Sequence, residues 1–258
     1  MKFSFRQMWT ITSKEYKTYF TSPIAYIMIA GFLLIMDWMF FFNLDHVNEI
    51  TMQYKASGTK VLSLTEGIVR PLYGSMNVIF LFITPFITMR LFAEERKMQT
   101  IQLLMTSPVS VGEMVFGKFL SSVMLITTML LLTLIYPVIL VMYGNPDLGP
   151  IFTNYLGIFL MACCYLSTGI FFSATSENQI AAGAMTFAAG FFFWLVHMAS
   201  QSAGPFLQVI LEYLSLTQHF NKFNMGIVNS SDVIFYLSYI GLGLFFTHRV
   251  MDSYRWRD

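Results

Sequence analysis

The residues of this 258-residue chain that could do chemistry are few, and one segment has the spacing of a phosphate-binding loop. Residues 112 to 118 read Gly-Glu-Met-Val-Phe-Gly-Lys. Phe119 follows where such a loop has Ser or Thr to hold magnesium, and no strand is expected before it. We therefore expect no nucleotide site in this chain, so ATP-driven work would require a partner.

Histidine and cysteine residues do not gather at the spacing of metal ligands. We interpret the four scattered histidines as polar packing or interfacial residues: His46, His197, His219 and His248. Cys163 and Cys164 are adjacent within an apolar run, which suits neither a disulfide framework nor a metal site. The sequence therefore predicts no catalytic, metal-binding or cofactor-binding residue.

Asp37 is an ionisable residue inside a long apolar stretch. A charge at such a place is costly, so it suggests a polar site within the membrane. Two other interpretations stay open: the residue packs against another helix, or it lies near the outer headgroups beside Trp38 and Asn43. A membrane-embedded lipid-modifying enzyme would need several acids or histidines, a set that Asp37 alone does not supply.

The composition indicates which elements position these residues. Apolar residues make up 56% of the chain and charged residues 11%, whereas soluble domains carry about a quarter charged residues. A bilayer core needs roughly 20 apolar residues of helix. Six stretches meet or approach this length, namely 24–44, 73–92, 119–143, 151–175, 179–200 and 233–248. We predict one all-α integral membrane domain over residues 1–258, with Pro85 and Pro137 kinking the second and third spans. The net charge of +1 indicates no nucleic-acid partner.

Basic residues set the expected orientation, because cytoplasmic loops retain Lys and Arg. With the N-terminus inside, eleven of the fifteen Lys and Arg residues lie on the cytoplasmic side. We therefore expect the protein in the inner membrane, with both termini in the cytoplasm. Residues 1–22 are predicted to form an amphipathic elbow helix in the interface, or else a frayed terminus. Pro23 is expected at the bend into the first span. The aromatic stripe of the helix is expected among the headgroups and consists of Phe5, Met8, Trp9, Tyr16, Tyr19 and Phe20.

The segment between the second and third spans is the most informative. A charge cluster from Glu94 to Lys97 ends the second span, and Met98, Ile101, Leu104 and Met105 then follow a helical period. Pro108 breaks that helix, and Ser110 with Glu113 forms a capping-box pattern that restarts it. We expect a kinked amphipathic pair of helices that can transmit force to the spans, or an ordinary loop resting on the bilayer.

These residues resemble a known family. Thr88-Met89-Arg90-Leu91-Phe92-Ala93-Glu94-Glu95-Arg96, then Thr100 to Ser110 and Gly117-Lys118-Phe119, is similar to the coupling region of ABC-2 permeases, particularly those like the gliding-motility permease GldF. The resemblance extends to Lys14-Glu15-Tyr16, to Tyr213-Leu214-Ser215 through His219-Phe220, to residues 226–232 and to Tyr254-Arg255-Trp256-Arg257. It covers nearly the whole chain. Gln99 departs from it, since the family usually has Gly there, which affects the local backbone geometry.

The resemblance implies a permease that couples ATP hydrolysis on a separate ABC ATPase to export, with ATP and magnesium held by that partner. It implies an ATPase-coupling interface made of Glu94, Glu95, Arg96, Thr100, Leu103, Leu104, Thr106, Ser107, Pro108, Val109 and Ser110. It further implies a second permease copy, a large periplasmic GldG-like subunit, and a segment from Ser202 to Ser231 that dips into the outer leaflet. The sequence leaves a plain surface loop helix open for that segment. A non-transporting membrane anchor of a larger complex is the alternative.

Overall fold

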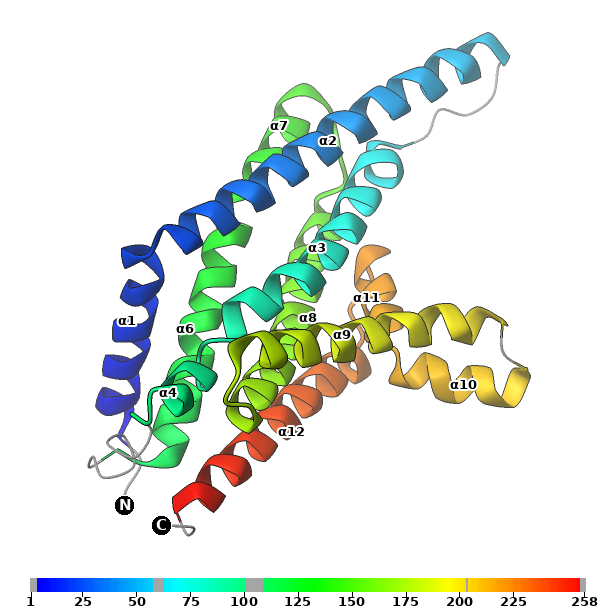
Figure 1. Cartoon of the computed structure of the whole chain (residues 1–258). Coiled ribbons are helices and arrows are strands. Elements are labelled where there is room, and N and C mark those ends of the chain that lie inside the picture. Colours follow the sequence, from blue (N-terminus) through cyan, green and yellow to red (C-terminus); the bar gives the residue numbers. More distant parts are fainter. Residues whose placement is uncertain (1–3, 58–62, 101–108, 203, 256–258) are drawn as a thin grey trace.

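Helices form almost every described element of the chain (Figure 1). The computed structural model describes residues 4–57, 63–100, 109–202 and 204–255. Their α-helices, in order, are α1 (Phe5–Thr21), α2 (Pro23–Ser57), α3 (Arg70–Thr88), α4 (Ala93–Lys97), α6 (Val111–Leu132), α7 (Ile135–Tyr143), α8 (Leu148–Thr175), α9 (Gln179–Ser202), α10 (Pro205–Leu214), α11 (Leu216–Asn224) and α12 (Ser230–Arg255). A π-helical turn, η1 (Thr65–Val69), leads into α3.

Six helical stretches among the described residues are long and apolar enough to cross a membrane. They are Pro23–Met52, Thr65–Lys97, Val111–Tyr143, Leu148–Thr175, Gln179–Ser202 and Ser230–Tyr254. Each of the six spans expected from the sequence lies within one of them. The prediction of an all-α membrane protein with six spans is therefore confirmed.

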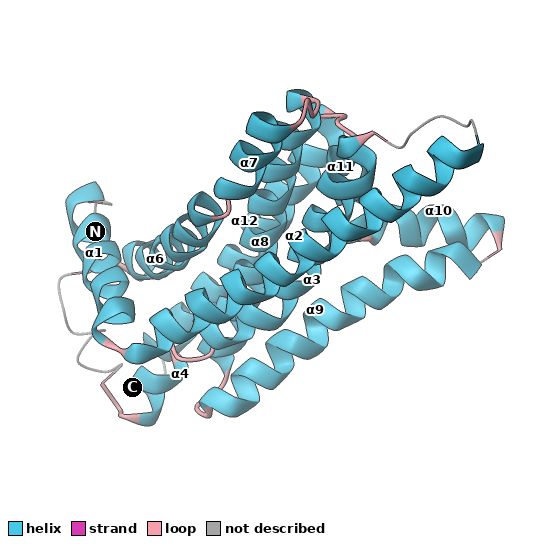
Figure 2. Cartoon of the chain, turned by 90° about the horizontal axis from the view of Figure 1, so that it is seen from above, coloured by secondary structure: helices cyan, strands magenta, loops and turns pink. Residues whose placement is uncertain are grey.

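The bundle is built around α8, which is the most buried of the six spans. It packs against α3, α6, α9 and α12, and small or apolar side chains such as Cys164 and Ile170 fill these contacts. Seen from above, α2, α3 and α9 lie side by side along one face (Figure 2). Much of the surface of α2, α9 and α12 stays exposed, as expected for helices that face lipid.

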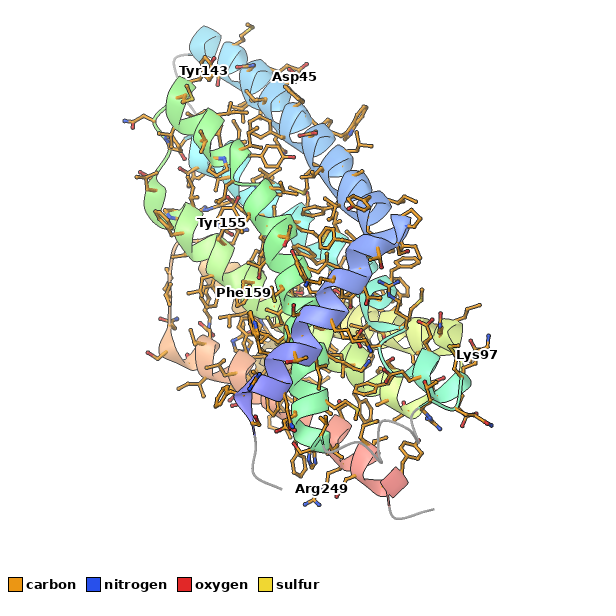
Figure 3. The ribbon with its side chains drawn as sticks, turned by 90° about the vertical axis from the view of Figure 1, so that its left-hand side faces the viewer. Asp45, Lys97, Tyr143, Tyr155, Phe159 and Arg249 are labelled. Carbon is orange, nitrogen blue, oxygen red and sulfur yellow. The ribbon has the colours of Figure 1, made fainter. Side chains whose placement is uncertain are left out.

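Both ends of the chain lie at one end of the bundle, which we call the terminal end (Figure 1). Lys97 and Arg249 lie at this end, whereas Asp45 and Tyr143 lie at the opposite, distal end (Figure 3). Six long helices bring the chain back to the side where it began. The loops of the bundle therefore fall into two groups, one on each side of the spans.

Proline interrupts the third span. Pro137 has no amide hydrogen to donate to the carbonyl oxygen of Thr133, and the helix is broken between α6 and α7 close to that position. That carbonyl oxygen accepts from the amide of Tyr136 at 3.1 Å, while the hydroxyl of Thr133 donates to the carbonyl oxygen of Leu130 and lies 3.1 Å from the hydroxyl of Tyr155 on α8. A tighter backbone bond and side-chain bonds therefore satisfy polar groups at the break, where lipid offers no partner. Pro85, by contrast, lies inside α3, which continues past it.

The elbow helix α1 packs along α6 and continues into α2 through a bend at Ser22 and Pro23 (Figure 3). The expectation that its whole aromatic stripe lies among the headgroups is wrong. Phe5 and Trp9 are exposed, but Tyr19 is buried, and its hydroxyl donates to the carbonyl oxygen of Ile87 at 3.3 Å. The stripe therefore has an exposed N-terminal part and a C-terminal part that the bundle covers. The covered part attaches the elbow helix to the bundle.

Close approach of α1 to α6 depends on Gly117. The hydroxyl of Thr12, which is fully buried, donates to the carbonyl oxygen of Gly117 at 3.1 Å. A methyl group added to Gly117 would lie 3.1 Å from the carbonyl oxygen of Met8 and 2.9 Å from a methyl carbon of Ile11. A side chain at this position would force the two helices apart.

The segment after the fifth span folds back on the bundle. Helix α10 runs back along α9, and α11 packs on α8, with Ser215 between them (Figure 1). The hydroxyl of Ser215 accepts a hydrogen bond from the amide of Gln218 and so caps α11. Gly226, at φ +87°, turns the chain over Pro150 toward α12. Whether this segment enters the outer leaflet stays a prediction.

We expect Gly117→Ala to destabilise the protein by about 1–3 kcal/mol, since the added methyl group overpacks the contact between α1 and α6. Gly31→Ala on α2 is the matched control, because nothing lies within 4 Å of its added methyl group. Thermal unfolding of the two variants in the same detergent measures the difference. Equal stability of the two variants would show that α1 is not tightly packed on α6.

Candidate functional site

The second span ends in a short helix with a defined terminus. Helix α4 stops at Lys97, and the next residues close it: the amide of Gln99 donates to the carbonyl oxygen of Arg96, and that of Thr100 to the carbonyl oxygen of Glu95. This pair of bonds is a Schellman motif, which needs a left-handed residue after the cap. Gln99 has φ +55° and fills that place. The departure from Gly noted in the sequence therefore falls on the one described position where a non-glycine residue has positive φ.

A buried ammonium group joins three helices at the terminal end. Lys118 on α6 is 3% exposed, and its Nζ donates to Glu15 Oε1 on α1 at 3.1 Å and to Glu95 Oε1 on α4 at 2.8 Å. It also donates to the carbonyl oxygen of Leu91 at 2.7 Å. All three donors of the lysine are used. This ion cluster, formed by Lys118, Glu15 and Glu95, links the elbow helix, the end of the second span and the start of the third.

Arg96 makes a second link, from α4 to the far side of the bundle. Its guanidinium donates to the carbonyl oxygen of Ala174 in the last turn of α8 at 3.1 Å and to Glu177 just after α8 at 2.8 Å. The same group lies over the ring of Tyr254 near the end of α12, 4.5 Å from its centre. A guanidinium suits this role, since it donates in a plane and stacks on an aromatic face.

Ser173 on α8 closes the turn between α3 and α4. Its hydroxyl oxygen accepts from the amides of Phe92 and Ala93, at 3.0 and 3.2 Å, and its hydrogen is directed to the carbonyl oxygen of Met89 at 3.2 Å. These backbone groups have left the α3 helix, so they need such partners. The start of α4 is thereby fixed to the central helix of the bundle.

Glu113 joins the beginnings of two helices. The capping box predicted from the sequence is confirmed: the hydroxyl of Ser110 accepts from the amide of Glu113, and the carboxylate of Glu113 accepts from the amide of Ser110 at 2.7 Å. The other carboxylate oxygen of Glu113 accepts from the amide of Ser4, the N-cap of α1. Residue 110 is therefore connected to the elbow helix through a single buried side chain.

A pocket of about 310 Å³ opens beside the ion cluster. It lies between the end of α1 and the turn after α4, and Glu94, Glu95, Arg90 and Lys118 are among its lining residues. The guanidinium of Arg90 lies 4.7 Å from the ring centre of Tyr19. Burial raises the pKa of Tyr19 to about 12, so this phenol stays neutral and acts as a hydrogen-bonding group.

The structure separates the residues predicted to face an ATPase. Glu94 is exposed, whereas Glu95 and Arg96 point into their ion pairs on the inner side of α4. Thr100, Val109 and Ser110 are half-buried. The remaining predicted residues lie outside the described part of the chain: Leu103, Leu104, Thr106, Ser107 and Pro108. The interface itself stays a prediction, with Glu94 as its most accessible described carboxylate.

Four residues that build this site were not predicted as site residues, although Glu15 and Tyr254 lie in stretches that carry the family resemblance. Glu15, Ser173, Glu177 and Tyr254 come from α1, α8, the residues just after α8, and α12. These residues approach α4 only when the bundle is folded, so the spacing of residues along the sequence does not predict the contacts. Lys118 did carry a signal, since it is a lone charge at the start of a long apolar stretch, where an unpaired ammonium would be costly.

Asp37, the predicted polar site within a span, lies on an exposed face of α2. Its Oδ1 accepts a hydrogen bond of 2.8 Å from the hydroxyl of Tyr136 on α7. It also lines a surface pocket of about 400 Å³ together with Trp38, Phe41 and Asp45. The carboxylate is thus tied to one neighbouring helix while still open to whatever covers this face.

The described residues form six apolar spans, and charged side chains join several of them at one end, which defines a multi-pass membrane protein. The sequence profile of a family described as ABC-2 family transporter protein matches residues 42–247. The chain belongs to this family. It is therefore a permease subunit of an ABC transporter, and the family implies an ABC ATPase and the lipid bilayer as its partners. No curated protein matches the chain.

We expect Lys118→Met to destabilise the protein by about 3–5 kcal/mol, because it leaves Glu15 and Glu95 facing each other without a cation. The double variant Lys118→Met with Glu95→Gln should recover part of that loss. Lys97→Met, at an exposed position nearby, is the control and should change stability by less than about 0.5 kcal/mol. Chemical unfolding in detergent measures all three, and a Lys118→Met variant as stable as the control would contradict the buried cluster.

Replacing Gln99 by Gly should stabilise the end of α4 by about 1 kcal/mol, since glycine adopts positive φ without the strain of a side chain. Met98→Gly is the matched control, because Met98 has a right-handed backbone and should lose stability instead. Hydrogen exchange of the amide of Thr100, which depends on this turn, reports the local effect. Opposite changes in the two variants are the expected result, and faster exchange in both would argue against the left-handed turn.

Proposed function

We propose that this chain is the membrane-spanning subunit of an ATP-driven exporter and that residues 94–110 are the place where a separate ATPase docks. The family membership supplies the class of protein. What supports the docking site is the ion cluster around Lys118, because it ties α4 to α1 and α6 at the terminal end. ATP and magnesium belong to the partner in this proposal.

The proposed transmission has two routes from the docked segment into the spans. In the first, a displacement of α4 acts on Glu95, and the buried pair with Lys118 passes it to α6 and, through Glu15, to α1. In the second, movement of Ser110 acts on Glu113, which holds the start of α1 through Ser4. Both routes cross short charge-assisted hydrogen bonds, which are stronger than bonds between neutral groups.

Arg96 would serve as the fixed point about which α4 turns. Its bonds to Ala174 and Glu177 and its contact with Tyr254 attach α4 to α8 and α12. When α4 turns about that attachment, Glu95 moves relative to Lys118. Rigid elements with two packed arrangements are the physical means by which such coupling travels.

The terminal end is cytoplasmic in this proposal, and the membrane is the inner membrane. A second permease chain would cover the exposed face of α2, where Asp37 would then border the route of the substrate instead of facing lipid. This placement removes the cost of a carboxylate against hydrocarbon. The resemblance to GldF-like permeases favours a related motility system with a large periplasmic subunit.

Charge reversal at Glu94 tests the docking site, since this side chain is exposed and its replacement leaves the ion cluster intact. We expect Glu94→Lys to reduce ATPase co-purification or permease-dependent ATP hydrolysis at least about tenfold, the effect of losing about 1.4 kcal/mol of binding. Glu49→Lys, at the exposed distal end of α2, is the control. The nearer Glu177 is not suitable for this purpose because it pairs with Arg96.

Crosslinking from Thr106→Cys provides a second readout of the same site. Both native cysteines are buried, so the introduced thiol reacts selectively. Two results together would overturn the docking proposal: normal ATP hydrolysis by an intact Glu94→Lys complex, and no ATPase captured by the thiol introduced at position 106. Normal hydrolysis with no export from liposomes would instead favour a non-transporting anchor.

A further inference from the structure

A cluster of ionisable side chains lies at the distal end, far from the proposed docking site. His219 on α11 places Nδ1 2.5 Å from Asp232 Oδ1 on α12, and Lys222 donates to the same oxygen from Nζ at 2.9 Å. Asp232 is completely buried and His219 is 6% exposed, whereas Lys222 is 41% exposed. The cluster therefore lies under the surface with its lysine next to the outside.

The second ring nitrogen of His219 fixes where one proton must be. Nε2 lies 3.0 Å from the carbonyl oxygen of Tyr213, the residue before the end of α10. A carbonyl oxygen only accepts hydrogen bonds, so Nε2 has to carry a hydrogen. If the imidazole were neutral, Nδ1 would then present a lone pair to the oxygen of Asp232.

Two lone pairs cannot face each other at 2.5 Å without strong repulsion. A proton must lie between Nδ1 and Oδ1, whether it belongs to an imidazolium or to a carboxylic acid. Asp232 lies in the first turn of α12, where the helix dipole favours a carboxylate, and Lys222 adds a further positive charge. The pair holds one removable proton in either description.

We propose that His219 and Asp232 form a binding site for a single proton that helps to hold α11 on α12, and that this junction weakens when the proton leaves. The proton reaches it from the distal side past Lys222. This site is independent of the ATPase proposal, since none of its residues belongs to the terminal end.

Three aromatic rings contact the imidazole. Phe235 stacks on the ring at 4.0 Å between centres, and Tyr213 and Tyr236 meet it edge-on. Nearby charged residues have their own partners: Glu212 of α10 accepts from Gln208, and Arg70 of α3 pairs with Glu66. His197 of α9 interacts electrostatically with Glu212, so its replacement is a suitable control for the loss of a histidine near α10.

Loss of the proton would loosen this junction without unfolding the helices. The hydroxyl of Tyr236 still donates to the carbonyl oxygen of Leu216, and that of Thr153 on α8 to the carbonyl oxygen of Phe223. Loss of the proton breaks only the hydrogen bond between His219 Nδ1 and Asp232 Oδ1, because Nε2 keeps its hydrogen for the carbonyl oxygen of Tyr213 and Lys222 still donates to Asp232. The junction between α11 and the start of α12 is therefore weakened, while α11 stays attached to α8 and α12.

Hydrogen exchange of the full chain in lipid nanodiscs, corrected for the intrinsic effect of pH, tests the site between about pH 5 and about pH 9. Wild-type amides of α11 should lose protection about tenfold along a single-proton curve as pH rises. His219→Gln has no removable proton, so its protection should not change with pH. His197→Gln should follow the wild-type curve.

Lys222→Met provides a test that does not require changing the pair. Removing a positive charge beside the pair strengthens proton binding by either group, so the midpoint should move up by on the order of one pH unit. A wild-type curve with no pH dependence, a pH dependence that persists in His219→Gln, or a midpoint in Lys222→Met that is unchanged or lower would each overturn the proposal.

Discussion

The arrangement of the terminal end depends on one electrostatic requirement: the ammonium of Lys118 is buried and must be neutralised. Glu15 and Glu95 meet that requirement from two different helices, and the carbonyl oxygen of Leu91 takes the third donor. A buried charge without such partners would cost several kcal/mol. The elbow helix, the end of the second span and the start of the third are consequently held in one relative position, from which the other contacts of the site follow.

Glycine and hydroxyl contacts allow the helices to come close enough for this cluster. Gly117 lies one residue before Lys118 and admits α1, while Ser173 lets the turn before α4 rest on α8. In a membrane there is no hydrophobic drive between helices, so close packing and hydrogen bonds of this kind stabilise the bundle. The charged contacts therefore require the small residues beside them.

Local patterns were sufficient to predict the six spans, the break near Pro137 and the capping box at Ser110, because each depends on neighbouring residues alone. The partners of Lys118 and Arg96 could not be predicted, since Glu15 lies 103 positions from Lys118 and Glu177 lies 81 positions from Arg96. The sequence also grouped Glu94, Glu95 and Arg96 as one surface. The structure divides them because a helix directs consecutive residues to different sides.

The length of α2 has a consequence for how the protein meets the outside. Its 35 residues span roughly 50 Å at 1.5 Å per residue, about 20 Å more than the hydrocarbon core. The polar stretch with Asp45, His46 and Glu49 belongs to this excess, and these side chains are exposed. The helix is thus long enough to extend past the lipid on the side opposite the termini, where a partner could contact it.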